Sequence, residues 1–175
     1  MALKILLLLF CVFPLINGRV IQSPPLPQEN TVENSNIKIM NQLKQTYSWG
    51  TRSQLEKAFG KTRVSKEPDE VLDGWAYTYK YKGFEVYFNN KNCEAMTVSG
   101  PEYRVLLNGQ PYSVGDNIIK LKEAFPISYK NRVTGKDASV GLHITHKGVI
   151  VDAYISISYN TKGIITSIEI ANDNS

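Results

Sequence analysis

Large apolar and smaller or polar residues alternate in the stretch WAYTYK of this 175-residue chain. Successive side chains of a β-strand point to opposite faces, so Trp75, Tyr77 and Tyr79 are expected to share one face. A Lys-Gly pair at 82–83 predicts a tight turn, because glycine accepts the positive φ that hairpin turns require. The alternation resumes over residues 84–88, and the whole region predicts an antiparallel hairpin.

The same pattern returns 65 residues later. Val140, Leu142 and Ile144 alternate with smaller or polar residues, Lys-Gly stands at 147–148, and a longer alternating run starts at Val149. The large apolar residues keep the same parity in both regions, so both sets, Val149 included, are expected to face a core. A third strand is expected in each region, in EAMTV and in IITSIEI.

A helix is predicted before each hairpin. The phrases YSWG at 47–50 and YSVG at 112–115 are also 65 residues apart, and each precedes apolar residues at helical spacing. Thr51 and Asp116 both suit the N-cap, because their side-chain oxygens can accept hydrogen bonds from the first turn. The second helix, in DNIIKLKEAFP, is expected to stop at Pro126, which has no amide hydrogen.

This repetition predicts an α+β protein made of two tandem diverged repeats, each with one or two helices packed on a three- to four-stranded antiparallel sheet. Repeat 1 is expected over residues 37–103 and repeat 2 over residues 104–175. The stretch 102–111 bridges them and is expected to be extended. A further short helix is expected in IKIMNQLKQTY, whose apolar residues also fall at helical spacing.

Residues 1–18 have the pattern of a secretory signal peptide. Lys4 precedes an apolar run that is too short to span a bilayer, and Gly18 stands at a plausible cleavage position. An uncleaved anchor and a lipid-modified Cys11 are the alternatives. Residues 19–36 are expected to be a flexible leader. The protein is therefore expected to be exported, periplasmic or secreted, with no stable membrane insertion.

The charge of the chain is mildly positive, with 20 Lys and Arg against 16 Asp and Glu. These cations are scattered along the sequence, whereas a nucleic-acid-binding protein gathers them on one face, so no nucleic-acid partner is expected. Attraction to an anionic envelope surface stays open. Once the signal peptide is removed, Cys93 is the remaining cysteine and no internal disulfide is expected, so stability must come from a packed core.

No motif predicts catalysis, a metal or a cofactor. His143 and His146 are three residues apart, a spacing that points them to opposite faces of a strand and suits joint metal binding poorly. No G-x-S-x-G elbow surrounds a serine or Cys93. The acidic residues between Glu67 and Asp73 are expected in a solvated loop.

These features, best seen in VGDNIIKLKEAFP and in the strand order, resemble two related groups. One is the β-lactamase inhibitor protein family, a secreted tandem of helix-on-sheet modules; the other is the small outer-membrane lipoproteins of the barrel-assembly machinery, which use one such module. The resemblance covers residues 46–172 and concerns architecture. It implies protein binding by a sheet surface. The chain departs from the first group in having no disulfides and from the second in having no lipobox.

The sheet face opposite to the predicted core is the expected binding surface. Tyr87 and Tyr154 stand on it where polar residues are expected, and exposed tyrosines are frequent interface anchors. The charge of this face is expected to come from Lys80, Glu85, His143 and Asp152. Its other expected members are Thr78, Thr145, Ser156 and Ser158.

The function expected from these observations is steric, non-catalytic binding of another protein, either secreted or part of the cell envelope. Inhibition, immunity and envelope assembly are all compatible with such binding. The alternative is a small-ligand carrier or a hydrolase that uses a cleft between the repeats. That alternative requires a deep apolar pocket with converging polar groups.

Overall fold

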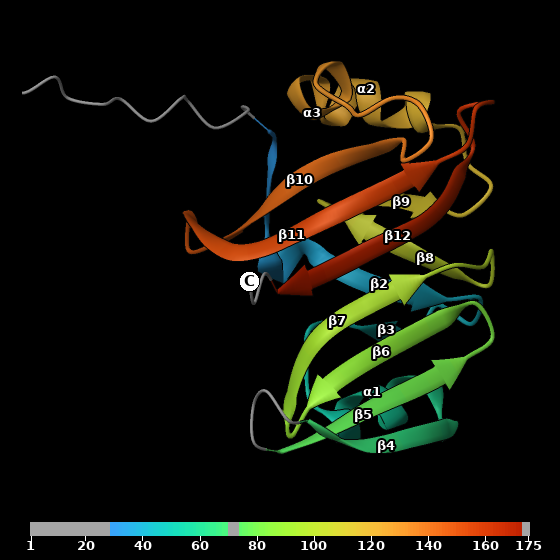
Figure 1. The fold of residues 1–175 in the computed structure, drawn as a ribbon, viewed down its shortest axis with the longest axis vertical. Helices are drawn as coiled ribbons and strands as arrows, with labels where there is room; N and C mark the ends of the chain where they lie inside the picture. Colours follow the sequence, from blue (N-terminus) through green and yellow to red (C-terminus); the bar gives the residue numbers. More distant parts are fainter. Residues whose placement is uncertain (1–28, 70–73, 173–175) are drawn as a thin grey trace, which may run out of the picture.

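The computed structural model describes residues 29–69 and 74–172, and its architecture is α+β. Twelve strands in these ranges form an eight-stranded and a four-stranded sheet, and short helices pack beside them (Figure 1). The signal peptide predicted over residues 1–18, with Cys11, lies outside the described residues.

The elements follow the chain in the order of their labels. The larger sheet contains β1 (Thr31–Glu33), β4 (Arg63–Asp69), β5 (Gly74–Tyr81), β6 (Phe84–Asn89), β7 (Asn92–Val98), β10 (Ser139–His146), β11 (Val149–Tyr159) and β12 (Ile165–Asn172). The smaller sheet contains β2 (Ile37–Asn41), β3 (Thr46–Tyr47), β8 (Tyr103–Leu107) and β9 (Gln110–Ser113). The α-helices are α1 (Arg52–Phe59), α2 (Leu121–Ala124) and α3 (Pro126–Lys130), and the 3-10 helices are η1 (Asn34–Asn36) and η2 (Ile118–Lys120).

The larger sheet consists of two meanders joined edge to edge. Its order is β1-β10-β11-β12-β7-β6-β5-β4, so β7 and β12 lie side by side at the centre. They pair in antiparallel register, with Val98 opposite Ile168 and Ala95 opposite Ala171. The predicted hairpins and third strands are therefore present, but they form one continuous sheet.

The smaller sheet, with the order β3-β2-β8-β9, was not predicted as a unit. The short helix expected in IKIMNQLKQTY is wrong, because Ile37 and Ile39 are buried while Lys38 between them is exposed, which is the period of a strand. Ile39 lies opposite Val105 in the central pair of this sheet. The extended bridge expected over residues 102–111 is confirmed as β8 and β9.

The hydrophobic core lies between the two sheets and extends under the helices. Thr51 caps α1 as predicted, and its side chain and that of Gln54 form a reciprocal capping box. Phe59, at the end of α1, makes edge contacts with the rings of Tyr81 and Phe84, so α1 covers the core face of β5 and β6. Figure 1 shows α1 and the smaller sheet behind the larger sheet.

The second predicted helix is divided. Asn117, rather than Asp116, caps η2, and its side chain accepts a hydrogen bond from the Ile119 amide. Pro126 does not stop the helical region but starts α3, since the first helical position needs no amide donor. Phe125, between α2 and α3, is buried and contacts the ring of Tyr112.

The predicted parity is right for Tyr79, which is buried, but two other core predictions are wrong. Trp75 is 44% exposed and Val149 is 67% exposed. Trp75 lies at the start of β5, where Lys66 Nζ sits 4.0 Å from the centre of its ring, and Val149 lies at the tip of the β10–β11 hairpin. Parity determines which face a side chain occupies, but not how far the core extends along the strand.

The leader expected over residues 19–36 is described from residue 29 onward. There it forms β1 and η1, and β1 pairs in parallel with β10 at the edge of the larger sheet. No helix in the described ranges is long and apolar enough to cross a membrane.

Candidate functional site

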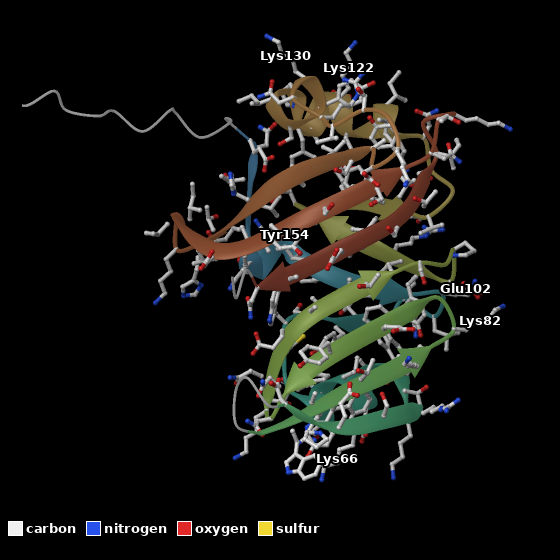
Figure 2. All side chains as sticks on the ribbon, viewed as in Figure 1. Lys66, Lys82, Glu102, Lys122, Lys130 and Tyr154 are labelled. Atoms are coloured by element: carbon white, nitrogen blue, oxygen red, sulfur yellow. The ribbon has the colours of Figure 1, made fainter. Side chains whose placement is uncertain are left out.

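One face of the larger sheet packs on the core, and the other faces the viewer in Figure 1 with no helix or strand in front of it. This open face carries the predicted binding residues. It arises because β6 and β11 place large apolar residues on the core side and polar or tyrosine residues on the other side. Figure 2 shows Tyr154 on the open face.

A single row of paired residues runs across this face and contains both predicted tyrosines. Tyr87 pairs with Ala95, Ala95 with Ala171, and Ala171 with Tyr154. Neighbouring strands lie about 4.8 Å apart, so three steps separate the backbones of the two tyrosines by about 14 Å. We call this the tyrosine row: Thr78, Tyr87, Ala95, Ala171, Tyr154 and His143. Two tyrosines thus flank a central strip of small side chains.

A second row lies beside it and carries charge. Lys80 pairs with Glu85, which shows that these two predicted residues are neighbours. The row continues through Thr97 to Glu169, at the junction of β7 and β12. The fourth predicted charged residue of this face, Asp152, is exposed and lies closer to the hairpin tip. We call this the charged row: Lys80, Glu85, Thr97, Glu169 and Ser156.

Hydrogen bonds hold Tyr87 in place. Its hydroxyl donates to Asp69 Oδ2 at 3.1 Å, and Asn89 Nδ2 donates to the same oxygen at 2.8 Å. Burial, together with the hydrogen bond to Asp69, raises the pKa of the Tyr87 hydroxyl, so it stays protonated and donating at neutral pH. The solvated loop predicted for Asp69 is wrong, because Asp69 ends strand β4.

Tyr154 occupies the equivalent place on the other side of the row. Its hydroxyl lies 3.5 Å from Glu169 Oε1. His143, its neighbour in the row, has Nε2 3.7 Å from Glu29 Oε2. Tyr87 and Tyr154 are each half-buried, so both keep part of their surface exposed.

Thr145 was expected on the open face but is buried. A register shift between His143 and Thr145 interrupts the pairing of β10 with β11. The Thr145 hydroxyl donates to Glu33 Oε2 at 2.9 Å, so Glu33 of β1 covers it. The Thr145 side chain therefore binds β1 within the sheet and is not available on the open face.

Neither histidine belongs to a metal-binding group in the described ranges, where no three His, Cys, Asp or Glu side chains converge. Cys93 is buried on the core side of the sheet, and burial raises the pKa of its thiol to about 12. A thiol with this pKa is almost entirely protonated at neutral pH and is a weak nucleophile.

Several residues of this surface were missed by the sequence reasoning. Ala95 and Ala171 carry no pattern of their own, and their pairing depends on β7 lying beside β12. Asp69 and Asn89 become recognisable as the support of Tyr87 only when β4 and β6 are placed on either side of β5.

Comparison of the chain with protein families, with curated proteins and with solved structures found no match.

Proposed function

We propose that this protein binds another protein through the open face of its larger sheet and acts sterically, without catalysis. The observation that carries the proposal is the tyrosine row, in which two supported aromatic side chains flank the partly exposed Ala95 and the buried Ala171 on a sheet face that no described helix or strand covers. Tyrosine supplies a large contact area with few rotatable bonds, which makes it a frequent anchor of interfaces.

The charge of the open face indicates the chemistry of the partner. Among the described residues, carboxylates outnumber Lys and Arg on this side of the sheet. The carboxylates include Glu29, Glu67, Asp69, Glu85, Asp152 and Glu169, and the cations include Arg63 and Lys80. Complementary potentials speed association and exclude wrong partners. We therefore expect a partner with a basic surface and at least one exposed apolar group that fits between the tyrosines.

The alternative, a carrier or hydrolase with a cleft between two halves of the chain, has less support. Backbone pairing bridges the halves twice, through β7 with β12 and through β2 with β8. A ligand cleft at that boundary would have to open these pairs. Binding over the open face requires no such change.

The proposed duplication of the chain agrees with this organisation. Tyr47 and Tyr112, in the two related phrases, are both buried and each precedes a helical segment. The strand pairs at the centre of the two sheets join corresponding parts of the predicted repeats. We also retain export as part of the proposal, on the pattern of residues 1–18.

The test is capture of a partner from secreted and envelope fractions, followed by cross-linking and binding measurements with the isolated partner. The double variant Tyr87→Ala/Tyr154→Ala is expected to weaken binding by at least about 30-fold, since each interface anchor contributes on the order of 1 kcal/mol or more. Trp75→Ala is the matched control, because Trp75 is an exposed aromatic residue on the other face of the same sheet.

Equal binding by wild type and the double variant would refute the open face as the interface. Equal losses in the double variant and in Trp75→Ala would do so as well, because the effect would then not be specific to that face. Loss of binding in the double variant alone would support the proposal.

A further inference from the structure

Positive charge gathers at the end of the molecule that carries α2 and α3. Residues 116–138 and 159–163, which we call the helical end, hold six Lys and Arg against three Asp and Glu, or +3 of the chain's formal +4. The fold brings the two segments together, since the Ile118 amide donates to Gly163 O at 2.8 Å and the Tyr159 hydroxyl to Val133 O at 2.8 Å. Cations that are scattered in the sequence therefore become neighbours.

Two of these cations, Lys122 and Lys130, are exposed and available to a ligand. Figure 2 shows Lys122 and Lys130 projecting from the helices away from the sheets. Among the described residues, one ion pair is found at this end, between Lys120 and Asp116. Lys122, Lys130 and Arg132 form no ion pair there.

A hollow of about 520 Å³ lies within the helical end. Its charged lining residues are Arg132 and Lys162, both cations, and the other lining residues are uncharged. The Arg132 guanidinium is 4.4 Å from the ring centre of Tyr129 and donates from Nη1 to Tyr129 O at 2.6 Å. This stacking orients the guanidinium, whose planar set of N–H donors can bind two phosphate oxygens at once.

Exposed aliphatic side chains stand among these cations. Ile119 is 60% exposed and lines the hollow, Val133 is 55% exposed, and Ile127 is 40% exposed. A soluble anion would satisfy the cations but leave these side chains in water. A lipid surface satisfies both, because phosphates meet the cations while apolar side chains enter the boundary between headgroups and acyl chains.

We propose that the helical end binds the surface of an anionic phospholipid bilayer. Arg132 and Lys162 hold a headgroup phosphate in the hollow, and Ile119 and Val133 enter the interface. This peripheral contact goes beyond the proposed protein binding and uses a different surface. The acidic open face is repelled by the same membrane, so charge also orients the molecule and leaves that face free for a protein.

The test is co-sedimentation of the protein with vesicles of phosphatidylcholine alone or mixed with phosphatidylglycerol. Binding is expected only to the mixed vesicles and is expected to be lost at about 1 M salt, where charges are screened beyond about 3 Å. Lys122→Glu/Lys130→Glu is expected to lower the partition coefficient at least about 25-fold, from about five-fold for each lost cation. Lys38→Glu/Lys91→Glu changes the net charge equally at exposed positions elsewhere and is expected to cost less than about five-fold.

Two further variants separate the parts of the site. Arg132→Lys keeps the positive charge but removes the planar guanidinium, and the partition coefficient is expected to drop about three-fold or more. Ile119→Ser/Val133→Ser is expected to weaken binding about ten-fold. Its matched control, Val149→Ser/Ile150→Ser, alters two equally exposed aliphatic residues at the hairpin tip. Circular dichroism confirms that each variant is folded.

Three outcomes would overturn the proposal. The first is equal binding to both kinds of vesicle, and the second is equal loss in the Lys122/Lys130 and Lys38/Lys91 variants. The third is no vesicle binding together with tight binding of soluble polyglutamate, which would assign the helical end to an acidic protein.

Discussion

The two Lys-Gly turns of the larger sheet share a sequence pattern but are held in place differently. One joins β5 to β6, with Tyr81 paired to Phe84, and the other joins β10 to β11, with His146 paired to Val149. Their glycines have nearly the same φ, 74° at Gly83 and 78° at Gly148. A Cβ at residue 83 would lie 2.7 Å from the Gly100 Cα, whereas a Cβ at residue 148 would meet nothing within 4 Å.

The second turn is held instead by a carboxylate from a distant strand. Lys147 also has a positive φ, 52°, so both central residues have positive φ, as a type I′ hairpin turn requires. Glu33 accepts hydrogen bonds from the Lys147 amide at 2.7 Å and from the Gly148 amide at 3.2 Å. These two bonds lower the pKa of the Glu33 carboxyl. A repeated motif thus specifies a reversal of the chain, while its surroundings decide what stabilises it.

The largest effect is expected for Gly83→Ala. The new Cβ would collide with the Gly100 backbone, and alanine is strained at positive φ. The free energy of unfolding is expected to fall by about 2 to 4 kcal/mol, measured by urea denaturation. A loss below about 1 kcal/mol would show that this turn is not fixed by packing.

Gly148→Ala is the matched substitution in the other turn and is expected to cost about 1 kcal/mol, because only the backbone strain remains. The same urea denaturation measures it. If both alanine variants lose the same free energy of unfolding, the difference in packing between the two turns does not contribute to stability.

Glu33→Gln is expected to change the pH dependence of the second turn. Since the folded pKa lies below the usual value of about 4.3, the ionised carboxyl stabilises the turn above that value, and this support is lost as the pH falls through the folded pKa. Hydrogen exchange at the Lys147 and Gly148 amides, corrected for intrinsic rates, should therefore accelerate in acid in the wild type. In Glu33→Gln it should be fast already at neutral pH. Unchanged protection in the variant would exclude Glu33 as the clamp.

The smallest effect is expected for Lys82→Gln at the first turn. Lys82 Nζ lies 2.8 Å from Glu102 Oε1, but the lysine side chain is 89% exposed, and such pairs contribute little to stability. No resolvable shift of the denaturation midpoint is expected. The pKa of Glu102, which the hydrogen bond from Lys82 lowers, should rise toward its usual range in an NMR titration. A large loss of stability would show that Lys82, as well as packing, stabilises this turn.

Features that depend on neighbours close in sequence could be predicted. Alternation located the two hairpins and the common face of Tyr87 and Tyr154, and the Thr51 side chain marked the start of α1. Strand β2 of the smaller sheet was predicted as a helix, because the apolar residues of IKIMNQL fit both a two-residue and a helical spacing. The burial of Ile37 and Ile39 against the rest of the core decided between the two.

The sequence by itself determined the α+β composition, the positions of the turns and the division of the larger sheet into a core face and an open face. Those properties follow from side-chain parity, capping and turn chemistry within a few residues. Only the tertiary structure decided that β7 pairs with β12, which assembles the tyrosine row, and that Glu33 reaches Lys147 across 114 residues. The cations of the helical end meet for the same reason. Contacts at such separations depend on which packing of all the strands buries the most apolar surface, and no local pattern specifies that choice.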